Sequence, residues 1–138
     1  MTEQSQEIMN LPDDERIPLE YRSLWRPFQA NGMTLFHLTT QANLESIRLA
    51  GQLIPKDPAP RNWAGMSAIF LANPSDPIYA RSLPHVLAHA QKKGDRLVRL
   101  YIETENSLYR STDPERTFQV MSLDPISTAD IVKIEYLD

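Results

Sequence analysis

The chain of 138 residues contains no cysteine. This absence excludes disulfide bonds, thiolate zinc sites and a cysteine nucleophile, and it is typical of a reducing compartment. No apolar run approaches the roughly 20 residues that a membrane-spanning helix needs. The first ten residues also lack the basic and then apolar pattern of a signal peptide. We therefore expect a cytoplasmic protein with no membrane-spanning segment.

Glycine is scarce, with four in the whole chain. No glycine-rich phosphate loop, dinucleotide-binding fingerprint or nucleophile elbow is present.

The net charge is −4, from 14 basic and 18 acidic side chains, and no basic run stands out. Because phosphate contacts supply most of the affinity of non-specific nucleic-acid binders, this charge disfavours nucleic acid as a partner, although a local basic patch stays possible.

Residues 1–32 differ from the rest of the chain, since they are acidic and contain three prolines. Proline ends helices and removes a hydrogen-bond donor, so we expect an extended arm with at most short helical pieces. Four of its apolar residues recur at intervals of three and four, which predicts one short amphipathic turn. They are Tyr21, Leu24, Trp25 and Phe28. The arm either docks on the body or serves as a partner-binding peptide, and the spacing favours docking.

Residues 33–138 are predicted to form one domain. A strand is expected at 34–38, and Thr39 or Thr40 can cap a following helix with its hydroxyl. Four apolar residues near a period of 3.6 form an apolar stripe along the helix, and Gly51 stands where a left-handed cap is needed. The stripe consists of Ala42, Leu44, Ile47 and Ala50.

Further strands are predicted at 68–72, 96–103, 117–122 and 131–137, with a partly helical segment at 76–93. A loop with three prolines is expected at 54–65. The strands outnumber the helices and do not alternate regularly with them. This order predicts an α+β fold and argues against a doubly wound sheet.

His37 is the first candidate for chemistry, because an imidazole in a strand next to a helix cap can offer one nitrogen to a ligand and the other to the backbone. The competing interpretation is a core histidine satisfied by a carbonyl group.

His85 and His89 have the spacing of a helical zinc pair. They lack a neighbouring glutamate in the metalloprotease position and an evident third ligand, so we expect no metal site. Three single arginines are candidate phosphate binders: Arg48, Arg61 and Arg81.

The order of the predicted elements resembles the ADP-ribosyltransferase-like fold, in particular its small bacterial branch near tRNA 2′-phosphotransferases and single-domain ADP-ribosylating toxins. The similarity spans about residues 33–137 and depends on order and spacing more than on any single motif. The segments that carry it are 35–40, 43–47, 51–55, 68–72, 97–103, 117–120 and 125–131. The resemblance implies an α+β domain with a split β-sheet core and short flanking helices.

The resemblance also implies roles for individual residues. His37 would contact the ribose beside nicotinamide, with Thr39 nearby, and Phe70 or Tyr79 would stack on the nicotinamide ring. Where the family carries a catalytic glutamate, this chain has Gln119. An amide brings no negative charge, so its stabilisation of an oxocarbenium-like transition state is weaker.

NAD, as a substrate, is the cofactor that the resemblance implies, with Arg48 and Arg61 as candidate phosphate contacts. The implied activity is the transfer of ADP-ribose to a macromolecular acceptor. A second hypothesis is a non-catalytic relative that binds a protein partner or regulates it, and Gln119 and the acidic arm favour that one. A third is RNA 2′-phosphate processing, which needs an arginine cluster beside His37. The acidic balance and the short arm disfavour this third hypothesis.

Overall fold

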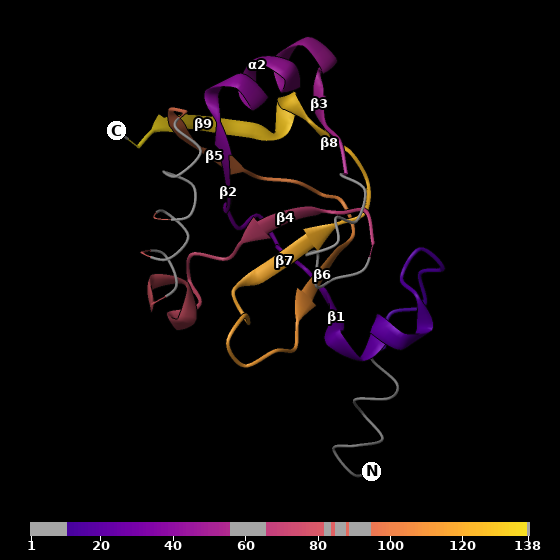
Figure 1. Cartoon of the computed structure of the whole chain (residues 1–138). Coiled ribbons are helices and arrows are strands. Elements are labelled where there is room, and N and C mark those ends of the chain that lie inside the picture. The colour runs from indigo at the N-terminus through magenta and orange to yellow at the C-terminus, as the bar shows by residue number, and fades with distance from the viewer. Residues whose placement is uncertain (1–10, 56–65, 82–83, 85–87, 89–94, 138) are drawn as a thin grey trace.

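The computed structural model describes residues 11–55, 66–81, 84, 88 and 95–137. They form an α+β fold in which one antiparallel sheet dominates and the helices are few and short (Figure 1). The elements are η1 (Leu19–Leu24), β1 (Trp25–Phe28), β2 (Leu35–Thr40), α2 (Gln41–Ala50), β3 (Gln52–Leu53), β4 (Ile69–Ala72), β5 (Leu97–Ile102), β6 (Leu108–Ser111), β7 (Gln119–Ser122), β8 (Ile126–Ser127), η2 (Thr128–Asp130) and β9 (Ile131–Tyr136). Residues 77–81 are also helical.

The seven strands of the main sheet follow the order β1-β6-β7-β4-β2-β5-β9, and every pair in it is antiparallel. β2 pairs with β5 along its full length, from Leu35 to Thr40. In contrast, β2 meets β4 at the single bridge between Phe36 and Ala72. The sheet is therefore divided into a four-strand set, β1-β6-β7-β4, and a three-strand set, β2-β5-β9. In Figure 1, β2 runs across the direction of β4 and β7.

Two apolar clusters hold this sheet. We call the first the central core, which lies where α2 packs on the sheet through Leu44. Its buried members are Ala30, Leu35, Leu44, Leu53, Ile69, Leu71, Val98, Leu100, Ile102, Leu108, Val120 and Ile126. We call the second the arm core, which joins the N-terminal segment to β4, β6 and β7. Its buried members are Ile17, Trp25, Met66, Ala68, Tyr109, Met121 and Leu123.

The α2 helix confirms the sequence prediction at both ends. Thr40 is the N-cap, and its hydroxyl accepts a hydrogen bond from the amide of Asn43 at 3.3 Å. Gly51 is the C-cap in the left-handed region, with a φ of 74°. Its amide donates to the carbonyl groups of Ile47 and Arg48, which satisfies acceptors that a helix end otherwise leaves open.

The N-terminal segment differs from the prediction, because it contributes a strand to the sheet. The amphipathic spacing ends at Leu24 with the 3-10 helix η1, and Trp25 begins β1, which pairs with β6. Pro27 lies within β1, which is tolerated because β1 is an edge strand. Trp25 is fully buried, so this segment is docked on the body.

The strands β3, β6 and β8 are also absent from the sequence prediction, whereas β2, β4, β5, β7 and β9 were predicted. β3 and β8 have two residues each, too few for an alternating pattern. The predicted loop at 54–65 and most of the predicted helix at 76–93 lie outside the described residues. No helix in the described part of the chain is long and apolar enough to cross a membrane.

Candidate functional site

His37 lies where β2 and β4 separate. It follows Phe36, which forms the single bridge to β4, and its Nδ1 lies 2.7 Å from the carbonyl oxygen of Phe70. Because a carbonyl oxygen only accepts, Nδ1 carries the proton in this hydrogen bond. In the neutral imidazole Nε2 is then an acceptor. The side chain is half-buried, and the bond to Phe70 fixes the imidazole at the gap between the strands.

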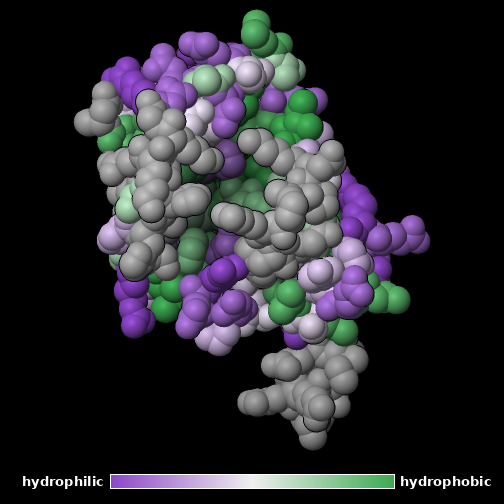
Figure 2. Space-filling view, in the orientation of Figure 1, coloured by the Kyte–Doolittle hydropathy of each residue, from purple (hydrophilic) through white to green (hydrophobic). Residues whose placement is uncertain are grey.

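The surface is hollowed over this part of the sheet. Figure 2 shows the depression at the centre of the view, and β2 and β4 occupy that place in Figure 1.

Aromatic rings form a chain across one face of the sheet beside the gap. The ring of Phe36 lies 4.6 Å from that of Tyr101 and 5.9 Å from that of Tyr79. Tyr79 in turn lies 6.0 Å from Phe118, edge to face. Burial raises the pKa of Tyr79, and its buried hydroxyl has no hydrogen-bond partner among the residues that the structure describes. Tyr79 therefore brings an aromatic ring and a buried hydroxyl to the same face as Phe36.

The ring of Phe70 is already engaged in packing. It lies 6.4 Å from the ring of Trp25 and packs against the arm core. Its backbone carbonyl, not its ring, is the group that contacts His37.

Gln119 lies on the other side of β4 from His37. It is opposite Ala72, which is opposite Phe36, so these three residues form one row across the sheet and share a face. His37 is adjacent to Phe36, so its side chain leaves the opposite side of β2. One strand separates the backbones of His37 and Gln119, which corresponds to roughly 10 Å. The two side chains thus leave opposite faces of the sheet, and their joint contact with one ligand, which would have to pass through the gap between β2 and β4, stays a prediction.

Glu115, the acidic residue nearest to Gln119 in sequence, is exposed in a turn. The carboxylate of Asp113 accepts a hydrogen bond from the amide of Glu115, and the carbonyl of Asp113 accepts from that of Arg116. These hydrogen bonds define a turn at Asp113.

The predicted phosphate contacts are not gathered in one place by the described residues. Arg48 is exposed on α2, which packs on the central core, and Arg81 is exposed in the helix that brings Tyr79 to Phe36. These two helices thus pack on opposite faces of β2. Thr39 is half-buried on β2, two residues after His37.

Arg61, His85 and His89 lie outside the described residues. Within the described ranges no group of three or more histidine, aspartate or glutamate side chains could hold a metal ion.

A charged and aromatic cluster on β5 and β9 extends the aromatic chain, although no role was predicted for it. Arg99 lies over the ring of Phe36 at 5.0 Å and forms an ion pair of 3.4 Å with Glu135. The hydroxyl of Tyr101 donates to Glu135 at 3.2 Å, and Lys133 lies 4.9 Å from the ring of Tyr101. The alternation in residues 96–103 and 131–137 predicts that these polar side chains lie on the opposite face from the apolar ones. It does not predict that the two strands pair with each other.

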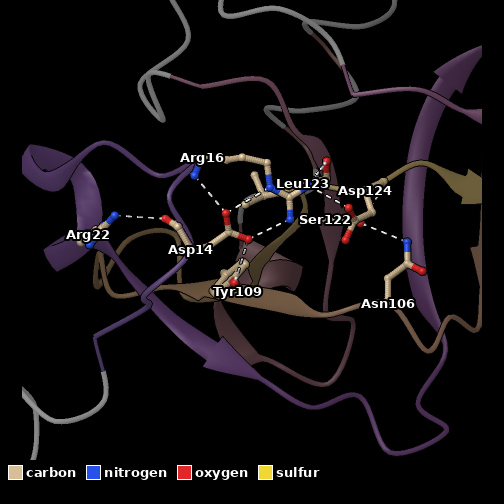
Figure 3. Close-up of polar contacts among 8 residues, drawn as sticks. All are labelled: Asp14, Arg16, Arg22, Asn106, Tyr109, Ser122, Leu123 and Asp124. Carbon is tan, nitrogen blue, oxygen red and sulfur yellow. Dashed lines mark hydrogen bonds and ion pairs between the residues drawn. The ribbon is translucent and has the colours of Figure 1, made fainter.

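A second polar network clamps the N-terminal segment to the sheet (Figure 3). Arg16 forms ion pairs of 2.7 Å with both Asp14 and Asp124. Hydrogen bonding from Arg16 lowers the pKa of Asp14 from 3.8 to about 2. The hydroxyl of Tyr109 also donates to Asp14, and burial raises the pKa of Tyr109. This network joins the N-terminal segment to β6 through Tyr109 and to the residues after β7 through Asp124.

Comparison of the chain with protein-family models, with curated proteins and with solved structures finds no match.

Proposed function

We propose that the chain is an NAD⁺-binding, ADP-ribosyltransferase-like protein that transfers ADP-ribose to a macromolecular acceptor. One observation carries the proposal: the sheet divides at the Phe36–Ala72 bridge, and His37 is fixed at that division. The resemblance in sequence implies a split sheet with a histidine on its first core strand. The division between β2 and β4 supports the proposal.

The reaction requires little of the chain beyond positioning and electrostatics. The glycosidic bond between the ribose C1′ and the nicotinamide nitrogen breaks, and its electron pair leaves with nicotinamide. The acceptor nucleophile bonds to C1′ and loses its proton. His37 orients the ribose, because an imidazole at the gap between β2 and β4 can form a hydrogen bond with a ribose hydroxyl. The rings of Phe36 and Tyr79 lie on the other face of β2 from the side chain of His37, so nicotinamide can stack on them only if the dinucleotide passes through the gap between β2 and β4.

Gln119 sets the rate in this proposal. Positive charge develops on the ribose in the transition state, and a neutral amide stabilises it less than a carboxylate does. We therefore expect slow turnover of NAD⁺ by the native chain. The substitution Gln119→Glu is expected to raise it by up to about 10²-fold, the size of effect typical for one electrostatic group. Release of nicotinamide, followed by chromatography, measures this rate, and Gln119→Asn is the matched neutral control.

Calorimetry tests binding separately from turnover. Titration with millimolar NAD⁺ or ADP-ribose is expected to give a saturable heat, and His37→Ala is expected to abolish it. Gly51→Ala serves as the control, because it destabilises the end of α2 and leaves His37 intact. No heat from the native chain, or unchanged binding by His37→Ala, would contradict the proposal.

A non-catalytic protein-binding or regulatory module is the second candidate, and Gln119 is the observation that favours it. An intact fold that binds NAD⁺ without turnover, even with Gln119→Glu, and that captures one specific protein would support this candidate. RNA 2′-phosphate processing receives no support from the described arginines, since Arg48 and Arg81 lie on helices that pack on opposite faces of β2.

A further inference from the structure

The strand β9 ends the three-strand set and leaves one of its edges open. It pairs with β5 on one side, and no strand in the described part of the chain pairs with its other side. Two of its apolar side chains are exposed, Val132 at 54% and Tyr136 at 37%. An edge strand with exposed apolar side chains is a template for pairing with another strand.

The backbone groups that face this open edge follow from the hydrogen bonds to β5. The amide of Leu137 donates to the carbonyl of Leu97 at 3.0 Å, so Leu137 directs its backbone groups toward β5. In an antiparallel pair this direction alternates from residue to residue. Glu135 and Lys133 therefore also direct their backbone groups toward β5, while Tyr136 and Ile134 direct theirs toward the open edge.

We propose that β9 pairs in antiparallel fashion with β9 of a second copy of this chain, about a two-fold axis through Ile134. With this axis, the outward amide of Ile134 in each copy donates a hydrogen bond to the carbonyl of Ile134 in the other copy. Lys133 of each copy lies opposite Glu135 of the other, which gives two pairs of opposite charge. Such cross-strand pairs stabilise a sheet, whereas like charges directly opposite destabilise it.

Backbone direction and charge together select this register. An axis through Lys133 or Glu135 would pair residues whose backbone groups face β5, and it would also place two lysines or two glutamates opposite each other. The register shift between β5 and β9 lies between Tyr101 and Ile102, at the start of β9, so residues 133–136 stay regular.

The charged side chains are already held on one face of the sheet. Lys133 lies 4.9 Å from the ring of Tyr101, whose hydroxyl donates to Glu135. The same axis brings exposed Tyr136 of one copy toward the start of β9 in the other, where Val132 lies at the register shift. A second copy is therefore complementary to β9 in its backbone hydrogen bonds and in its charges.

Sedimentation velocity from micromolar to millimolar concentration tests the proposal. The native chain is expected to approach twice its monomer mass of 15.8 kDa. Lys133→Glu places carboxylates opposite each other in both pairs, and Glu135→Lys does the same with ammonium groups. Each substitution alone is expected to weaken the dimer about tenfold or more.

Mixing the two variants gives the decisive result. In the mixed dimer both cross-strand pairs again have opposite charges, so the mixture is expected to dimerise although neither variant does alone. Glu45→Lys and Arg81→Glu, which alter charge at exposed helical positions, are the matched controls and are expected to leave the dimer unchanged. A native chain that stays monomeric at millimolar concentration overturns the proposal. Dimers that persist in both variants, or that fail to return in the mixture of folded variants, overturn it as well.

Discussion

His37 has two interpretations, a core histidine and a ligand-binding residue, and both require a partner for the imidazole. The carbonyl of Phe70 is that partner. A core histidine needs such a partner, and a ligand-binding histidine needs it to fix the tautomer. Exposure separates the two readings, because His37 is half-buried at a gap between strands and the neighbouring core positions Leu35 and Leu100 are fully buried. At this scale the position of His37 favours contact with a ligand.

Asp14 supplies a prediction about pH. Its pKa in the folded chain is about 2, against an ordinary 3.8, because Arg16 stabilises the carboxylate. A lowered pKa contributes stability that is present above pH 3.8 and is lost as the pH falls toward 2. We expect Asp14→Asn to lower the free energy of unfolding at pH 7 by about 1 kcal/mol, since half-exposed Arg16 is partly screened.

Urea unfolding between pH 7 and pH 2 measures this difference, which is expected to shrink as the native carboxylate becomes protonated. The exposed neighbour Asp13 provides the matched control, Asp13→Asn, for which we expect little change. A difference between Asp14→Asn and the native chain that does not vary with pH would show that the ion pair is not its source.

Helix α2 shows at the scale of an element why some structure can be read from sequence. Its cap, its apolar stripe and its terminal glycine all lie within a dozen residues, so each signal is local. The strand β1 has no such local signal, because the spacing of Trp25 and Phe28 from Tyr21 is helical. Its pairing with β6, whose residues lie 80 to 86 positions further along the chain, decides its conformation.

Gly51 gives a prediction at this scale. Its φ of 74° disfavours any residue with a Cβ, while a Cβ placed there would meet nothing within 4 Å. Gly51→Ala is therefore expected to cost about 1 kcal/mol through backbone strain alone. Gly51→Asn is expected to cost less, because asparagine adopts this conformation more readily. Chemical denaturation compares the two variants, and equal losses would indicate a steric cause in place of strain.

The division of the sheet is a property of the whole molecule. It depends on where β2 stops pairing with β4, and no local pattern in either strand reveals that point. The sequence does place His37 on the correct strand, because Leu35 to Thr40 carries a strand pattern next to a helix cap. It could not place Tyr79 against Phe36, since that contact depends on how the helix after β4 returns to the sheet.

The N-terminal segment gives a prediction at the scale of the whole chain. Trp25 is fully buried in the arm core, so Trp25→Ala is expected to lower the free energy of unfolding by about 3 to 5 kcal/mol. Leu19, which is 80% exposed in the same segment, is the control, and Leu19→Ala is expected to change little. Thermal unfolding followed by circular dichroism measures both. A small effect of Trp25→Ala would mean that the segment is an appendage and not a part of the fold.

The claim that the split between β2 and β4 is a nucleotide site is tested most directly by nuclear magnetic resonance. NAD⁺ is titrated into the uniformly ¹⁵N-labelled chain, and backbone amide shifts are followed residue by residue. The account predicts saturable shifts at His37, Leu38, Phe70 and Gln119, with α2 beyond its first turn unchanged. Saturable shifts confined to residues away from the split, or no shifts at millimolar NAD⁺, would contradict it.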